Sequence, residues 1–121
     1  MTVLTGGRQI EVELAGAERG WAEGNAGLAR VGSRRAAGMA LAGWLAVAPR
    51  AGYGTNFMHH LRAMADDTEI DPPLREAAWR LAARPVPEGG WIVPPPHPLT
   101  PMMDARTIID WCAARLAQPP A

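Results

Sequence analysis

The chain has 121 residues, of which 48% are hydrophobic and 20% are charged, so it is long enough for one domain and too apolar for wholesale disorder. Twelve arginines balance twelve acidic residues, which excludes an overall charge that would attract nucleic acid or an anionic membrane. The single cysteine, Cys112, excludes an internal disulfide and a cysteine-rich zinc site, and it indicates a reducing compartment, the cytoplasm.

The first predicted element is a helix over residues 9–23, after a flexible N-terminal arm of residues 1–8. Ile10, Val12 and Leu14 alternate with glutamates as in a strand. However, Ile10, Leu14, Ala17 and Trp21 also follow the spacing of one helix face. We predict the helix, because the chain offers no second clear strand to pair with the first.

The longest predicted helix covers residues 26–48, with Asn25 as its N-cap and Pro49 as its end. Its buried stripe is predicted from the larger apolar residues together with the alanines between them: Leu28, Val31, Met39 and Leu45. Ser33-Arg34-Arg35 before an uncharged run also mimics a twin-arginine export signal. Its position more than thirty residues into the chain, and the proline after it, favour a buried helix.

Three shorter helices follow. Thr55 or Asn56 caps a helix that runs to about residue 65, with Phe57, Leu61 and Met64 on its inward face. Asp71 and Pro72 begin a helix that ends before Pro85, and Thr100-Pro101 begins the last, which runs to about residue 116. The buried stripes of these last two helices are predicted from Leu74, Ala77, Ala78 and Leu81, and from Met102 or Met103, Ala105, Ile108 or Ile109, Cys112 and Leu116.

These elements predict an all-α fold, a small antiparallel bundle of four to five helices in a single domain over residues 9–116. A proline-rich loop over residues 85–101 precedes the last helix, Trp91, Ile92 and Val93 are expected to pin it to the bundle, and residues 117–121 form a flexible tail. Trp44 and Trp79 are predicted to fill the core, although a tryptophan on an alanine-rich face also suits a dimer contact.

The candidate catalytic residues all lie in the third predicted helix. His59, His60 and Arg62 are the catalytic candidates, since a neutral histidine can act as a general base while an arginine holds a phosphate or an oxyanion. Tyr53 and Asn56 stand beside them as candidate binding residues. The alternative is structural, with one histidine bonded to a neighbouring helix and the other solvated. No third ligand accompanies His59 and Asp66, so neither a metal nor another cofactor is expected.

Arg34 and Arg35 are the other candidate binding residues, as a pair of guanidinium groups that could read phosphates. Because they lie in the middle of the long helix, they must point at least partly out of the core. The alternative reading places them on a solvated edge of the helix or pairs them with Glu18 or Glu23 of the first helix.

The run from Gly24 to Leu41 (GNAGLARVGSRRAAGMAL), followed by Tyr53-Gly54 and the segment from Phe57 to Leu61 (FMHHL), resembles the small HEPN-like (higher eukaryotes and prokaryotes nucleotide-binding) helical proteins. That resemblance implies a helical bundle, frequent dimerisation, and membership of toxin–antitoxin modules or of metal-independent ribonucleases. The ribonuclease members carry an arginine shortly before a histidine. Here eight residues separate Arg50 from His59, so the resemblance implies a degenerate, non-catalytic member.

We therefore expect a non-catalytic interaction module that self-associates and binds a protein partner. The alternatives are a metal-independent ribonuclease and a protein that binds RNA or a nucleotide without cleaving it. No membrane partner is expected, because the uncharged run over residues 36–48 is shorter than the ~20 residues that span a bilayer.

Overall fold

A computed structural model describes residues 6–83 and 99–117 of the chain, and within these ranges it contains five helices and no strand. The helices are α1 (Gly7–Ala22), α2 (Ala26–Val47), α3 (Phe57–Asp66), α4 (Pro72–Ala82) and α5 (Pro101–Ala117). The predicted all-α bundle is confirmed, and each predicted helix is found close to its expected bounds. The expected contacts of Trp91, Ile92 and Val93 with the bundle lie outside the described residues.

Local capping explains where several helices begin. The side-chain oxygen of Asn25 accepts a hydrogen bond from the backbone N–H of Leu28 at 3.0 Å, as expected of an N-cap. The Thr100 hydroxyl oxygen accepts one from the N–H of Met103 at 3.2 Å. Asp71 precedes Pro72 at the start of α4 without such a bond, since proline supplies the helical φ and has no N–H to satisfy.

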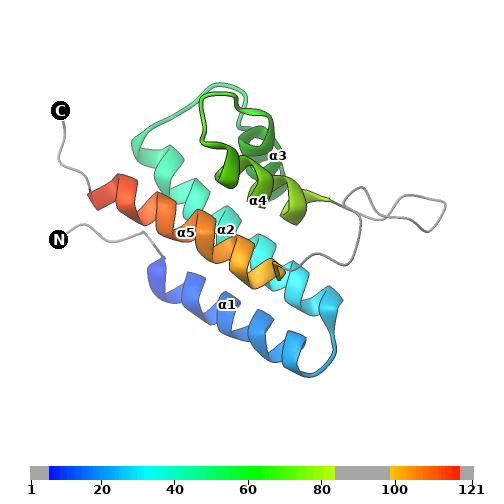
Figure 1. Ribbon diagram of the computed structural model, residues 1–121. Helices are drawn as coiled ribbons and strands as arrows, with labels where there is room; N and C mark the ends of the chain where they lie inside the picture. Colours follow the sequence, from blue (N-terminus) through cyan, green and yellow to red (C-terminus); the bar gives the residue numbers. More distant parts are fainter. Residues whose placement is uncertain (1–5, 84–98, 118–121) are drawn as a thin grey trace.

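Helix α2 is the centre of the bundle, because it contacts each of the other four described helices. It forms an antiparallel hairpin with α1, while α5 lies along it in the same general direction and α3 and α4 pack together beside it (Figure 1). Helix α1 contacts neither α3 nor α4 within the described residues. Among the described helices only α2 and α5 therefore pack against α1, and Leu28 and Val31 of the hairpin are left half exposed.

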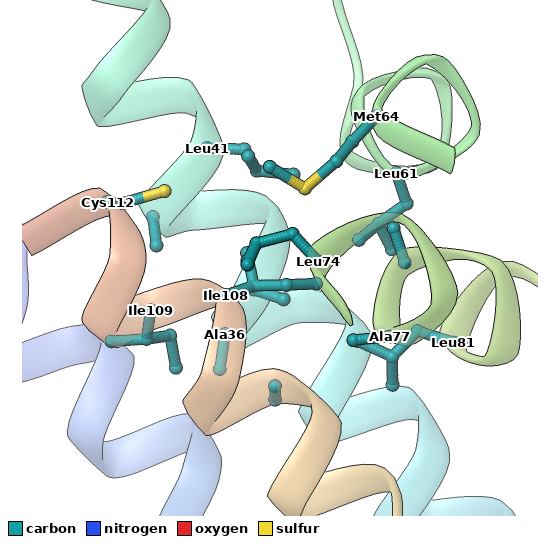
Figure 2. Close-up of a cluster of buried hydrophobic side chains, with 14 of the residues drawn as sticks. Ala36, Leu41, Leu61, Met64, Leu74, Ala77, Leu81, Ile108, Ile109 and Cys112 are labelled. Atoms are coloured by element: carbon teal, nitrogen blue, oxygen red, sulfur yellow. The ribbon is translucent and has the colours of Figure 1, made fainter. Parts of the chain in front are cut away.

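The core is built where α2, α3, α4 and α5 meet. Leu41, Met64, Leu74 and Ile108 converge there from these four helices (Figure 2), and Cys112 is buried in the same cluster. Burial raises the pKa of the Cys112 thiol to about 12, so it acts as a small apolar side chain. Trp44 is buried as predicted, and its ring meets Trp111 edge to face with centroids 4.8 Å apart.

Several sequence predictions of burial were wrong. Trp21 and Trp79 are each more than two-fifths exposed, and Phe57 is partly exposed at the start of α3. Leu28 and Val31, expected in the buried stripe of α2, are half exposed. The buried face of α2 consists instead of Leu41, Trp44 and most of the alanines, because small side chains allow neighbouring helices to approach closely.

Gly38 of α2 allows α3 to approach closely, which leads to a stability prediction. A Cβ at Gly38 would lie 2.3 Å from the Cβ of Phe57, so Gly38→Ala must displace the first turn of α3. We expect Gly38→Ala to lower the free energy of unfolding by about 1–3 kcal/mol in urea denaturation. Gly27→Ala in the same helix is the matched control, because its Cβ meets only the Asn25 side-chain oxygen at 3.7 Å. An equal loss in both variants would contradict the steric argument.

Candidate functional site around helix α3

The loop before α3 brings the candidate residues Asn56 and His59 together. Gly54 takes a φ of 66°, and a Cβ there would lie 2.6 Å from the Cβ of His59, so only glycine fits this turn. Asn56 then caps α3, its side-chain oxygen accepting the N–H of His59 at 2.9 Å. The candidate binding residue Asn56 therefore has a structural role in starting the helix.

The two histidines of α3 have different surroundings. His60 is buried, and its Nδ1 lies 2.8 Å from the backbone carbonyl oxygen of Tyr53. Because a carbonyl can only accept, Nδ1–H is the donor, and this bond ties α3 to the preceding loop. His59 is exposed and shares an outward face of α3 with Arg62 and Asp66. Of the predicted catalytic candidates, His59 and Arg62 are the ones that solvent can reach.

Tyr53 belongs to a polar network that sequence analysis did not find. Its hydroxyl donates to Oδ2 of Asp67 at 2.7 Å, and the same oxygen accepts two hydrogen bonds from Arg50, at 2.6 and 3.1 Å. Arg50 also pairs with Glu69 at 2.7 Å. The network joins the α2–α3 loop to the α3–α4 loop. The sequence features that could have indicated this network are the single basic residue of the α2–α3 loop, Arg50, and the acidic residues of the α3–α4 loop.

The network shifts the pKa values of Asp67, Tyr53 and Arg50. The Tyr53 hydroxyl, followed by the Glu69 N–H and Arg50, holds the pKa of Asp67 below its ordinary value against the opposing effect of burial. Burial, and then the bond to Asp67, raises the pKa of Tyr53. Glu69 and Asp67 raise the pKa of Arg50. Asp67 is therefore a carboxylate at neutral pH, and Tyr53 stays protonated.

A hollow of about 670 Å³ opens beside this network, lined by Arg50, Tyr53, Asp66, Asp67 and Glu69 among others. Three of these side chains are acidic and one is basic. Arg50 already forms ion pairs with two carboxylates, those of Asp67 and Glu69. The arrangement fastens two loops together and provides no free cation for a phosphate.

The network leads to a prediction about acid stability. Because the pKa of Asp67 is lowered on folding, its carboxylate stabilises the fold above the unfolded value of about 3.9. This contribution is lost as the pH falls through that value toward the folded pKa. We expect Asp67→Asn to lose about 1.5–3 kcal/mol at pH 7 and to unfold with a shallower dependence on pH below about 4. Urea titrations at several pH values test this, and Asp66→Asn at the exposed neighbour is the control. An unchanged acid slope in Asp67→Asn would contradict it.

Arg34 is held against the end of α4. Its guanidinium group donates to the backbone carbonyl oxygens of Leu81 and Ala83, both at 2.5 Å, and Arg30 donates to Ala83 at 2.8 Å. These arginines donate hydrogen bonds to carbonyl oxygens that have no partner within the helix at its C-terminal end. Their positive charges also interact favourably with the negative end of the helix dipole. Burial, then Arg30 and Arg62, lower the pKa of Arg34. Positive charge from α2 and α3 therefore gathers beside the end of α4.

Arg35 points toward α1. Its guanidinium nitrogen lies 3.3 Å from Glu13, and its side chain is more than half exposed. The sequence alternative of a salt bridge to α1 was right about the helix and wrong about the residue, since Glu18 and Glu23 had been expected. Arg34 and Arg35 therefore face different neighbours, and the bonds described for them do not form a single paired phosphate clamp.

No group of three or more histidine, cysteine, aspartate or glutamate side chains within residues 6–83 and 99–117 is arranged to hold a metal ion. None of the described helices is both long enough and apolar enough to cross a membrane. Comparison with known protein families, with curated proteins and with solved structures finds no match.

Proposed function

We propose that this chain is a non-catalytic helical interaction module that forms a homodimer and binds a protein partner in the cytoplasm. The resemblance of residues 24–41 and of the Tyr53 turn to small HEPN-like proteins supports this proposal, and it suggests a partner of the toxin–antitoxin kind. The single cysteine supports the compartment.

The observation that carries the proposal is that most candidate polar groups are held in contacts within the fold. Asn56 caps α3, His60 bonds the Tyr53 carbonyl, and the Tyr53 hydroxyl bonds Asp67. A general base needs a side chain within reach of the substrate proton, and these groups are buried or already bonded. They fix the shape of the surface around α3 rather than act on a substrate.

Exposed apolar side chains give the module a means of association. Two groups of large apolar residues reach the surface, one on the hairpin and one on α3 and α4: Val12, Trp21, Leu28 and Val31, and Phe57 and Trp79. Apolar groups of this size occur at protein interfaces, where tryptophan is especially frequent.

Sedimentation of the purified chain, together with an RNA cleavage assay in EDTA, tests this function. We expect a dimer and no cleavage of single-stranded RNA by the parent chain. His59→Ala and Arg62→Ala change exposed side chains and so should leave the fold intact. Cleavage by the parent that either variant abolishes would overturn the non-catalytic reading and favour a metal-independent ribonuclease.

A second function, binding of RNA or a nucleotide without cleavage, is favoured by the position of Arg62. Its charge adds to that of Arg34, and no carboxylate is among the groups that shift the pKa of Arg34. A phosphate group would relieve this repulsion. The measurement is the affinity for single-stranded RNA as a function of salt, in the parent and in Arg62→Ala. This function would be supported by an affinity that falls with salt in the parent chain and is weaker in Arg62→Ala. Equal affinities of the two chains would exclude a role for Arg62 in RNA binding.

A further inference from the structure

A groove of about 360 Å³ runs between α1 and α2 on the open side of the hairpin, and we call it the α1–α2 groove. Leu28 and Val31 line it and are 51% and 50% exposed. Leu28 lies over Gly20, where an added Cβ would be only 3.3 Å from the leucine side chain. Gly32 sits against Ala17 and the backbone of Glu13, with 3.0 Å left for an added Cβ. The glycines thus serve the packing of the hairpin, while Leu28 and Val31 remain open to a partner.

Charged side chains are arranged unevenly along the α1–α2 groove. Glu13 and Arg35 form an ion pair near one end, and Glu23 lies at the other. The Arg19 side chain runs back along α1, and its guanidinium nitrogen lies 3.6 Å from the position of an added Cβ at Gly16. Glu13 and the C-cap residue Glu23 are ten residues apart along α1, which corresponds to about 15 Å along its axis. The two bases therefore lie on the Glu13 side of the groove and Glu23 is the acid of the other end, with Leu28 and Val31 between Glu23 and the Glu13–Arg35 pair.

We infer that the α1–α2 groove binds the same groove of a second copy of this chain, related by a two-fold axis. In a two-fold pair the two partners present the same surface, and a two-fold axis at right angles to the groove places one end of each groove against the opposite end of the other. Glu23 of one copy then meets Arg35 of the other, so the acidic end of each groove faces the end that carries the bases. The zero net charge of the chain adds no long-range repulsion between copies. This inference rests on the proposed self-association and assigns it to one surface.

The apolar part of the interface is tested with Val31→Asp in the full chain, measured by sedimentation at several concentrations. We expect at least about a tenfold increase in the dissociation constant of the dimer, because the carboxylate would be buried between two apolar surfaces. Val47→Asp is the matched control, since Val47 is also an exposed valine of α2 but lies outside the groove. Circular dichroism verifies that both variants fold.

The charged part is tested by exchange of charges between the two ends. Arg35→Glu and Glu23→Arg should each weaken their own homodimer, since each places like charges opposite one another. An equal mixture of the two variants should form a heterodimer nearly as tight as the parent dimer, because every facing pair is then opposite in sign. A residue that served only to stabilise its own chain would not give this rescue.

The outcomes separate the inference from the function on which it rests. A parent chain that dimerises, while Val31→Asp dimerises equally well and the charge variants show no rescue in the mixture, would overturn the assignment to the groove and leave self-association intact. A parent chain that stays monomeric at every concentration would overturn both.

Discussion

Asp104→Ala is expected to lower the free energy of unfolding by about 3 kcal/mol or more. Asp104 is only 3% exposed, and its carboxylate accepts two hydrogen bonds from Arg80, at 2.9 and 3.0 Å. This pair joins α4 to α5 and raises the pKa of Arg80 through the hydrogen bond to Asp104. Removal of one partner leaves the other charge largely buried and unpaired, which typically costs about 3–5 kcal/mol. Urea denaturation at neutral pH measures the loss.

The control for Asp104→Ala lies on the same helix. Asp110 is exposed and approaches Arg106 only at 4.0 Å, so Asp110→Ala should change stability by less than about 0.5 kcal/mol. The double variant Asp104→Leu/Arg80→Met removes both charges at once and should be more stable than Asp104→Ala. If the double variant were less stable than the single one, an uncompensated charge would not be the cause of the loss.

The ends of the helices could be predicted from the sequence because the signals are local. Asn25, Asn56 and Pro72 each act within one turn of their own helix, so neighbouring residues alone identify the start. The same local chemistry misled the search for a site. An asparagine ahead of a histidine-rich helix is as suitable for a cap as for a ligand, and Asn56 serves as the cap.

The pairing of distant polar residues could not be predicted in the same way. Arg50 bonds Asp67 across seventeen residues, and Arg80 bonds Asp104 across twenty-four. Arg34 was a candidate phosphate reader expected to point at least partly out of the core, and it donates to the carbonyls that end α4. In each case a charge shows that a partner is needed, but only the packing of helices and loops decides which residue supplies it.

The buried face of α2 was harder to predict, because apolar residues occur on nearly every side of this helix. The larger side chains indicated a stripe through Leu28 and Val31, yet these are half exposed. The central helix of a bundle must accept close neighbours on several sides, and alanines and glycines satisfy that requirement better than leucines. Of the predicted stripe, Leu28 and Val31 therefore lie on the open face of α2 that borders the α1–α2 groove, whereas Met39 and Leu45 are partly buried against the core.

Leu41→Ala tests this account of α2 and is expected to lower the free energy of unfolding by about 2–5 kcal/mol. Leu41 was not among the large residues of the predicted stripe, yet it is 0% exposed and points toward Met64 in the core (Figure 2). Val47→Ala in the last turn of the same helix should cost less than about 0.5 kcal/mol, since Val47 is 71% exposed. Urea denaturation of both variants gives the comparison. Similar losses would mean that the two faces of α2 contribute equally to the core, and the assignment of its buried face would be wrong.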